Sequence, residues 1–144
     1  MRMDGSWRLC DDGIIRPVFR AAVLDRNGRP VTTYFLADSG ADRTTLCAEF
    51  FAELALKPNS DPSNLAGVGG AEASVIVETA IEISRDAGGV IAIKGKFAAF
   101  TDPVALDMNV LGRDITNLFT LILDRNSDTV CLLGPGHRFI VVES

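Results

Sequence analysis

The sequence has little of what metal sites, disulfide scaffolds and nucleic-acid binders need. Among 144 residues there are three cysteines and one histidine. These are too few and too scattered for a disulfide framework or a zinc site of the usual kind. Lysine and arginine total 14 against 19 aspartates and glutamates, which gives a net charge of −5. Because this balance leaves no cationic surplus for a phosphate backbone, we expect no nucleic-acid partner.

Long apolar runs are missing as well. No run reaches the roughly 18 residues of a membrane-spanning helix, and residues 1–12 lack the apolar stretch of a signal peptide. The low cysteine content agrees with a reducing compartment. We therefore expect a cytoplasmic protein with no membrane partner, no metal and no cofactor. The length predicts a single domain over residues 1–144.

Short apolar runs separated by turn residues predict a mainly β fold. Asn27-Gly28 predicts a tight hairpin between the first two runs. Pro17 predicts an edge or a bulge at the start of the first strand, and Gly95 predicts a bulge in a later one. The expected strands span residues 14–24, 31–37, 74–83, 90–100, 106–111, 120–124 and 129–133, with a β-prone tail at 138–142.

Two helices are expected. The first spans residues 45–56, where apolar side chains fall on one stripe, with Thr45 as N-cap and Pro58 ending the helix. The second is short, spans residues 114–119, and begins with Asp114 as N-cap.

Three segments carry the chemistry. The first is an apolar strand that runs into Asp-Ser-Gly-Ala-Asp at residues 38–42. Alone it is typical of a turn, because Asp and Ser bond their own backbone and glycine adopts positive φ. The second is a glycine-rich hairpin tip at residues 65–70, and the third is Val-Leu-Gly-Arg-Asp at residues 110–114.

In this order the three segments resemble the retropepsin-like aspartic proteases, the single-domain relatives of pepsin. The resemblance covers about residues 21–123. It implies a closed, β-barrel-like sheet with a glycine-rich flap and one or two short helices. It also implies catalytic Asp38, a supporting loop of Ser39, Gly40 and Ala41 whose serine hydroxyl bonds across a dimer axis, a flap of Gly67, Val68, Gly69 and Gly70, and an ion pair between Asp42 and Arg113.

The chemistry of peptide hydrolysis explains these residue types. Without a metal or a covalent nucleophile, the reaction needs a water, a base and an acid, and two carboxylates sharing one proton supply both roles. The sequence contains one Asp-Ser-Gly segment. A catalytic pair therefore requires Asp38 from each of two chains on a two-fold axis. We predict a homodimeric aspartic endopeptidase that binds an extended peptide or protein substrate between flap and floor.

Two other functions are considered. A catalytically silent dimerisation or peptide-binding module could share the fold, although an intact Asp38-Ser39-Gly40 favours the enzyme. A serine hydrolase using Ser39 is disfavoured, because alanines stand at positions 37 and 41, where the Gly-x-Ser-x-Gly elbow has glycines. His137, far along the chain, is also a poor base for that serine.

Overall fold

The computed structural model describes residues 1–59, 74–136 and 142. Of these residues, 50% lie in strands and 9% in helices, so the fold is mainly β. No helix in these ranges is long and apolar enough to cross a membrane. Three sets of predictions lie outside the described residues: the flap at Gly67–Gly70, the placement of His137, and most of the tail at 138–142.

Ten strands and two helices lie in the described ranges. The hairpin predicted from Asn27-Gly28 is present at residues 25–29. A second tight hairpin lies at residues 85–89, and Gly28, Gly88 and Gly89 have the positive φ that such turns need. The strands are β1 Arg2–Asp4, β2 Ser6–Leu9, β3 Ile15–Leu24, β4 Pro30–Ala37, β5 Thr45–Leu46, β6 Ser74–Ser84, β7 Val90–Phe100, β8 Asn109–Leu111, β9 Thr120–Asp124 and β10 Thr129–Leu133, and the helices are α1 Ala48–Leu54 and α2 Arg113–Thr116.

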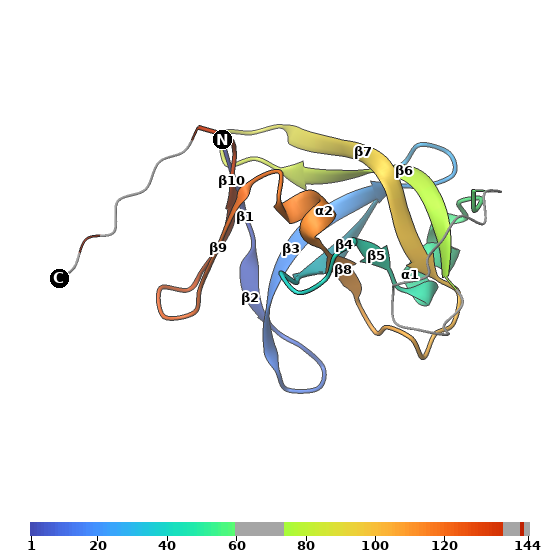
Figure 1. Cartoon of the computed structure of the whole chain (residues 1–144), viewed down its shortest axis with the longest axis horizontal. Helices are drawn as coiled ribbons and strands as arrows, with labels where there is room; N and C mark the ends of the chain where they lie inside the picture. The colour runs from blue at the N-terminus through green and yellow to red at the C-terminus, as the bar shows by residue number, and fades with distance from the viewer. Residues whose placement is uncertain (60–73, 137–141, 143–144) are drawn as a thin grey trace.

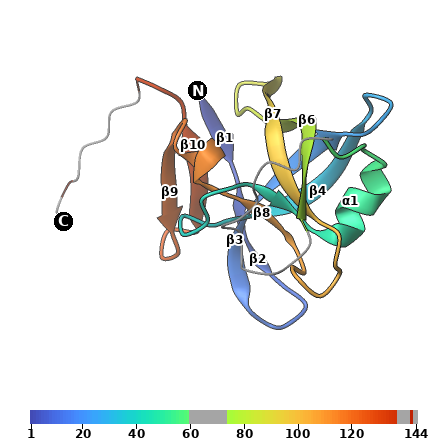
Figure 2. The same cartoon turned by 45° about the vertical axis from the view of Figure 1, so that its right-hand side comes forward.

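The larger sheet closes on itself. Its strand order is β2-β3-β4-β8-β5-β7-β6, and β3 also pairs with β6, so six strands form a closed barrel. Most neighbours are antiparallel, whereas β4 lies parallel to β8 and β5 parallel to β7. The smaller sheet has the order β1-β10-β9. It lies on one side of the barrel, and α1 lies on the other (Figures 1 and 2).

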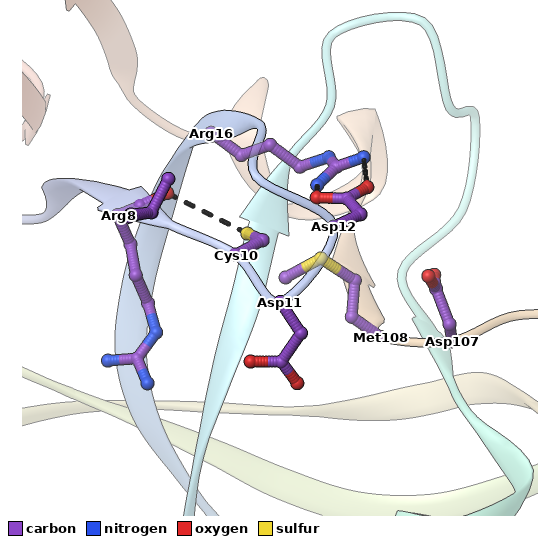
Figure 3. A pocket seen from close by; sticks show the side chains of 8 residues that line it. Arg8, Cys10, Asp11, Asp12, Arg16, Asp107 and Met108 are labelled. Atoms are coloured by element: carbon purple, nitrogen blue, oxygen red, sulfur yellow. Dashed lines mark hydrogen bonds and ion pairs between the residues drawn. The ribbon is translucent and has the colours of Figure 1, made fainter.

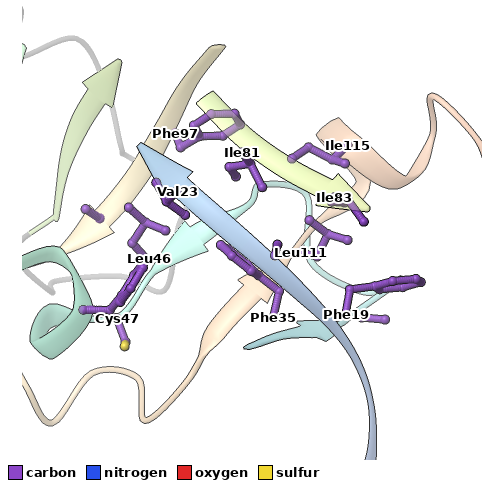
Figure 4. Packing of buried hydrophobic residues seen from close by; sticks show 14 of the residues in the cluster. Phe19, Val23, Phe35, Leu46, Cys47, Ile81, Ile83, Phe97, Leu111 and Ile115 are labelled. Atoms are coloured by element: carbon purple, nitrogen blue, oxygen red, sulfur yellow. The ribbon is translucent and has the colours of Figure 1, made fainter. Parts of the chain in front are cut away.

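The core fills the barrel. In β4 the buried side chains alternate with half-buried ones towards the end of the strand, so that Phe35 and Ala37 face inward. Large side chains from facing strands meet there, and they include Phe19, Phe35, Leu46, Ile81 and Leu111, each fully buried (Figure 4). This packing fixes which face of β4 is turned away from the core.

Gly5 is the corner between the two sheets. β1 pairs with β10 in the small sheet, and β2 pairs with β3 in the large one. The Gly5 amide donates to the Val130 carbonyl at 2.8 Å, and a Cβ at this position would collide with the Val18 carbonyl oxygen. Only glycine fits such a close backbone approach. Just beyond the corner, the Trp7 indole donates to carbonyls at both ends of the β9–β10 turn.

The helix prediction for residues 45–56 is wrong at its start. Thr45 and Leu46 are buried and form β5, which pairs with β7 and β8, so tertiary pairing overrides the helical pattern. The N-cap is Cys47, and the Thr45 hydroxyl bonds the Arg43 carbonyl instead. The helix ends in a left-handed Ala55, before Pro58.

Three smaller expectations also differ from the structure, and two strands were not expected. Asp114 is not an N-cap, because α2 follows Gly112. Gly95 makes no bulge, since its pairing with Thr79 lies in an unbroken register. The strand predicted from residue 106 begins at Asn109, and β1 and β2 were not predicted. Pro17 is paired with Trp7 of β2, and the expected edge is present only on its other side, because β4 pairs with β3 from Val18 onward.

Candidate active site

Asp38 lies at the end of β4, on the face away from the core. Ala37 points inward, so the next side chain points outward, and Asp38 is half-buried. Its Oδ1 accepts a hydrogen bond from the Gly40 amide at 2.8 Å. Its own amide donates to the Leu111 carbonyl at 3.2 Å, and its carbonyl accepts from the Ala41 amide at 3.3 Å. The carboxylate is thus held at a fixed position on a loop that is open to solvent.

The turn before α2 is bonded to this loop along the backbone. The Arg113 amide donates to the Ala41 carbonyl at 2.8 Å, and the Asp114 amide donates to the Asp42 carbonyl at 3.2 Å. Gly112 is buried, and a Cβ there would collide with the backbone of Arg43. The parallel pairing of β4 with β8 brings the two segments to the same end of the barrel.

Thr44 makes a buried connection that sequence reasoning missed. Thr44 is fully buried. Its hydroxyl oxygen accepts a hydrogen bond from the Gly112 amide at 3.0 Å. The same hydroxyl donates to Asp114 Oδ1 at 2.7 Å, and that oxygen also accepts from the Thr44 amide at 2.9 Å. A threonine directly after the loop was the available signal, but its partners lie 68 and 70 residues away.

The expected ion pair between Arg113 and Asp42 is present. It lies at the surface, because the two side chains are 47% and 80% exposed. Exposed pairs of this kind contribute about 0–1 kcal/mol to the free energy of unfolding. This pair is therefore a minor part of what holds the Asp38 loop in place.

The structure brings together one group of predicted residues. Asp38, Ser39, Gly40, Ala41 and Asp42 lie on the loop that contacts Arg113. Ser39 and Gly40 are exposed beside the carboxylate, so another molecule can approach it.

No protein-family model and no curated protein matches the sequence. Solved structures do match the fold. A retropepsin-like aspartic protease from Rickettsia conorii aligns over 92% of this chain and 88% of its own, with 17% identity and a TM-score of 0.54. The retroviral protease-like domain of Ddi1 from Leishmania major aligns over 84% of this chain and 96% of its own, with 14% identity and a TM-score of 0.51. At these identities the likeness concerns the fold, and the chain has the retropepsin-like fold expected from its sequence.

Proposed function

We propose that the chain is an aspartic endopeptidase that works as a homodimer. The observation that carries this proposal is the geometry of Asp38. Its carboxylate is half-buried, points away from the core, and is oriented by the Gly40 amide on a loop bonded to the turn before α2. The retropepsin-like fold, together with an Asp-Ser-Gly segment at the end of β4, supports this assignment.

The dimer follows from the number of carboxylates. Acid and base are both needed, and the sequence has one Asp-Ser-Gly segment. Two copies related by a two-fold axis bring two Asp38 side chains together, and exposed Ser39 and Gly40 leave room for that approach. Two like charges at close range cannot both ionise easily, so the pair holds one proton and titrates as a unit.

The shared proton defines the chemical steps. The ionised carboxylate takes a proton from water while the water oxygen attacks the peptide carbonyl carbon, and the protonated carboxyl gives its proton to the carbonyl oxygen. The tetrahedral diol then collapses: the C–N bond breaks, the leaving nitrogen takes a proton from the protonated carboxyl, and one diol hydroxyl returns its proton to the ionised carboxylate, which restores the singly protonated pair. An extended peptide in the cytoplasm is the proposed substrate, bound through its main chain.

A cleavage assay tests the assignment. A denatured protein library is incubated with wild type, Asp38→Asn and Asp128→Asn, each with and without a pepstatin-type inhibitor. Asp128 is the matched control, because it lies in the β9–β10 turn with φ 52°, a conformation that asparagine tolerates. Cleavage by wild type and the control, but not by Asp38→Asn, is expected. Residual cleavage by purified Asp38→Asn, or a strictly monomeric active species in sedimentation, would overturn the proposal.

A further inference from the structure

The strand that leads to Asp38 carries another side chain on the same face. Since Phe35 and Ala37 point into the core, Tyr34 lies on the outer face of β4, and Asp38, the first residue after the strand, lies on the continuation of that face. Residues in a strand rise about 3.3 Å each, which separates these two positions by about 13 Å. An extended peptide covers this distance with about four residues.

A cavity of about 270 Å³, which we name the Tyr34 pocket, opens beside that ring. Its apolar lining includes Tyr34, Phe50 and Met108, and its charged lining is Glu49, Glu53 and Asp107. Of the described residues, no lysine or arginine lines it. Apolar side chains below and carboxylates around a cavity suit a ligand with an apolar stem and a positive end, as lysine and arginine side chains have.

The neighbouring cavity shows how a cation is held next to this ring. It has a volume of about 320 Å³, shares Asp107 and Met108 with the Tyr34 pocket, and lies against the β2–β3 hairpin (Figure 3). There the Arg8 guanidinium lies over the Tyr34 ring, 4.1 Å from its centroid. Arg16 forms two hydrogen bonds with Asp12, at 2.8 and 2.6 Å, so its charge is compensated locally.

The carboxylates of the Tyr34 pocket have no such compensation. Glu49 and Glu53 are four residues apart on α1, which makes them neighbours on one side of the helix, where like charges repel. Within the part of the chain that the structure describes, neither of them, nor Asp107, forms an ion pair. A bound cation would remove this repulsion.

We infer that the Tyr34 pocket binds a lysine or arginine side chain of the peptide substrate, about four residues from the bond that is cut. This inference rests on the proposed function for its meaning as a substrate subsite. Tyr34, Phe50 and Met108 contact the methylene stem, and Glu49, Glu53 and Asp107 attract the charge. The Tyr34 pocket therefore selects substrates by charge, at a distance from the scissile bond.

The experiment compares paired peptides that differ only in lysine or glutamine at one position, moved stepwise from the cleavage site. Wild type, Glu49→Gln/Glu53→Gln and the Asp128→Asn control are compared by kcat/KM. Wild type and the control are expected to prefer lysine at one position by about fivefold, and the double variant to lose that preference. Because the double substitution removes a repulsion on α1, folding is not at risk.

Binding separates this inference from the proposed function. The labelled lysine peptide is titrated against Asp38→Asn, with and without the Glu49→Gln/Glu53→Gln change, at low and high salt. Weaker binding after loss of the two carboxylates supports the Tyr34 pocket even if no peptide is cleaved, an outcome that would sink the protease assignment alone. Equal binding and equal kcat/KM for lysine and glutamine peptides would overturn the pocket and leave the protease standing.

Discussion

Besides backbone hydrogen bonds, two side-chain contacts join the Asp38 loop to the turn before α2, and they differ in burial. The first is the buried connection from Thr44 to Gly112 and Asp114, in which one hydroxyl both accepts and donates. The second is the surface ion pair between Arg113 and Asp42. The ion pair involves full charges that are easy to see in the sequence, but solvent weakens it. The buried hydroxyl is neutral, yet its removal leaves polar groups without partners.

Of the substitutions considered, one at Gly112 is expected to disrupt the buried Thr44 connection most severely. In Gly112→Ala, the new Cβ collides with the Arg43 backbone, which cannot move without displacing the hydrogen bonds of Thr44. We expect a loss of about 3 kcal/mol or more in the free energy of unfolding, and a shifted Asp38 loop. Chemical denaturation measures the loss. Gly136→Ala, at a position with open space but a φ of 90°, is a milder glycine control, and an equal loss in both variants would contradict the steric argument.

Thr44→Val tests the hydroxyl itself. Valine keeps the shape of the side chain, but the Gly112 amide loses its acceptor and the Asp114 carboxylate loses the hydrogen bond from the hydroxyl. We expect a loss of about 1–3 kcal/mol in the free energy of unfolding, measured by urea denaturation. Thr44→Ser retains the hydroxyl and serves as the control. A valine variant as stable as the serine variant would show that this connection contributes little.

Arg113→Ala tests the surface side. Because the pair is exposed, we expect a loss of about 0–1 kcal/mol, reduced further in high salt. A double-mutant cycle with Asp42→Ala isolates the pair from other effects of each substitution. A coupling energy well above 1 kcal/mol would reverse the ranking of the two contacts.

A second surface ion pair, Arg16–Asp12, makes a contribution to stability that should depend on pH. The hydrogen bonds from Arg16 lower the pKa of Asp12 from its ordinary 3.8 to about 2. A lowered pKa in the folded state means that the stabilisation is present above pH 3.8 and is lost as the pH falls towards 2. The small difference in stability between wild type and Asp12→Asn should therefore disappear over that range. A difference that persists below pH 2 would exclude this cause.

Local signals predicted the elements that depend on neighbours in sequence. Asn27-Gly28 and Gly88-Gly89 define turns whatever the rest of the chain does, so the hairpins β3–β4 and β6–β7 were predictable. β1 was not, because its partner β10 lies about 130 residues along the chain. Thr45 and Leu46 fit a helical stripe equally well, and only pairing with β7 and β8 makes them a strand.

The candidate site divides in the same way. The Asp38 loop and the ion pair between its Asp42 and Arg113 were predictable, because short motifs in a recognisable order along the sequence contain these residues. The role of Thr44 was not, since a hydroxyl has many local partners and its actual ones come from a distant turn. For the same reason, Asp114 was predicted to cap α2, whereas its carboxylate accepts hydrogen bonds from Thr44.

The pairing of β1 with β10 also has a consequence for how the chain is made. During synthesis on the ribosome, β1 emerges well before β10 and has no partner until β10 has followed it. Met3, fully buried in the finished protein, stays exposed to solvent throughout that interval. Strands so distant in sequence pair slowly, because the entropy cost of closing a long loop comes before any stabilising contact between them. The small sheet is therefore expected to assemble last, as the slowest step of folding, and to be the part of the nascent chain that depends most on chaperones.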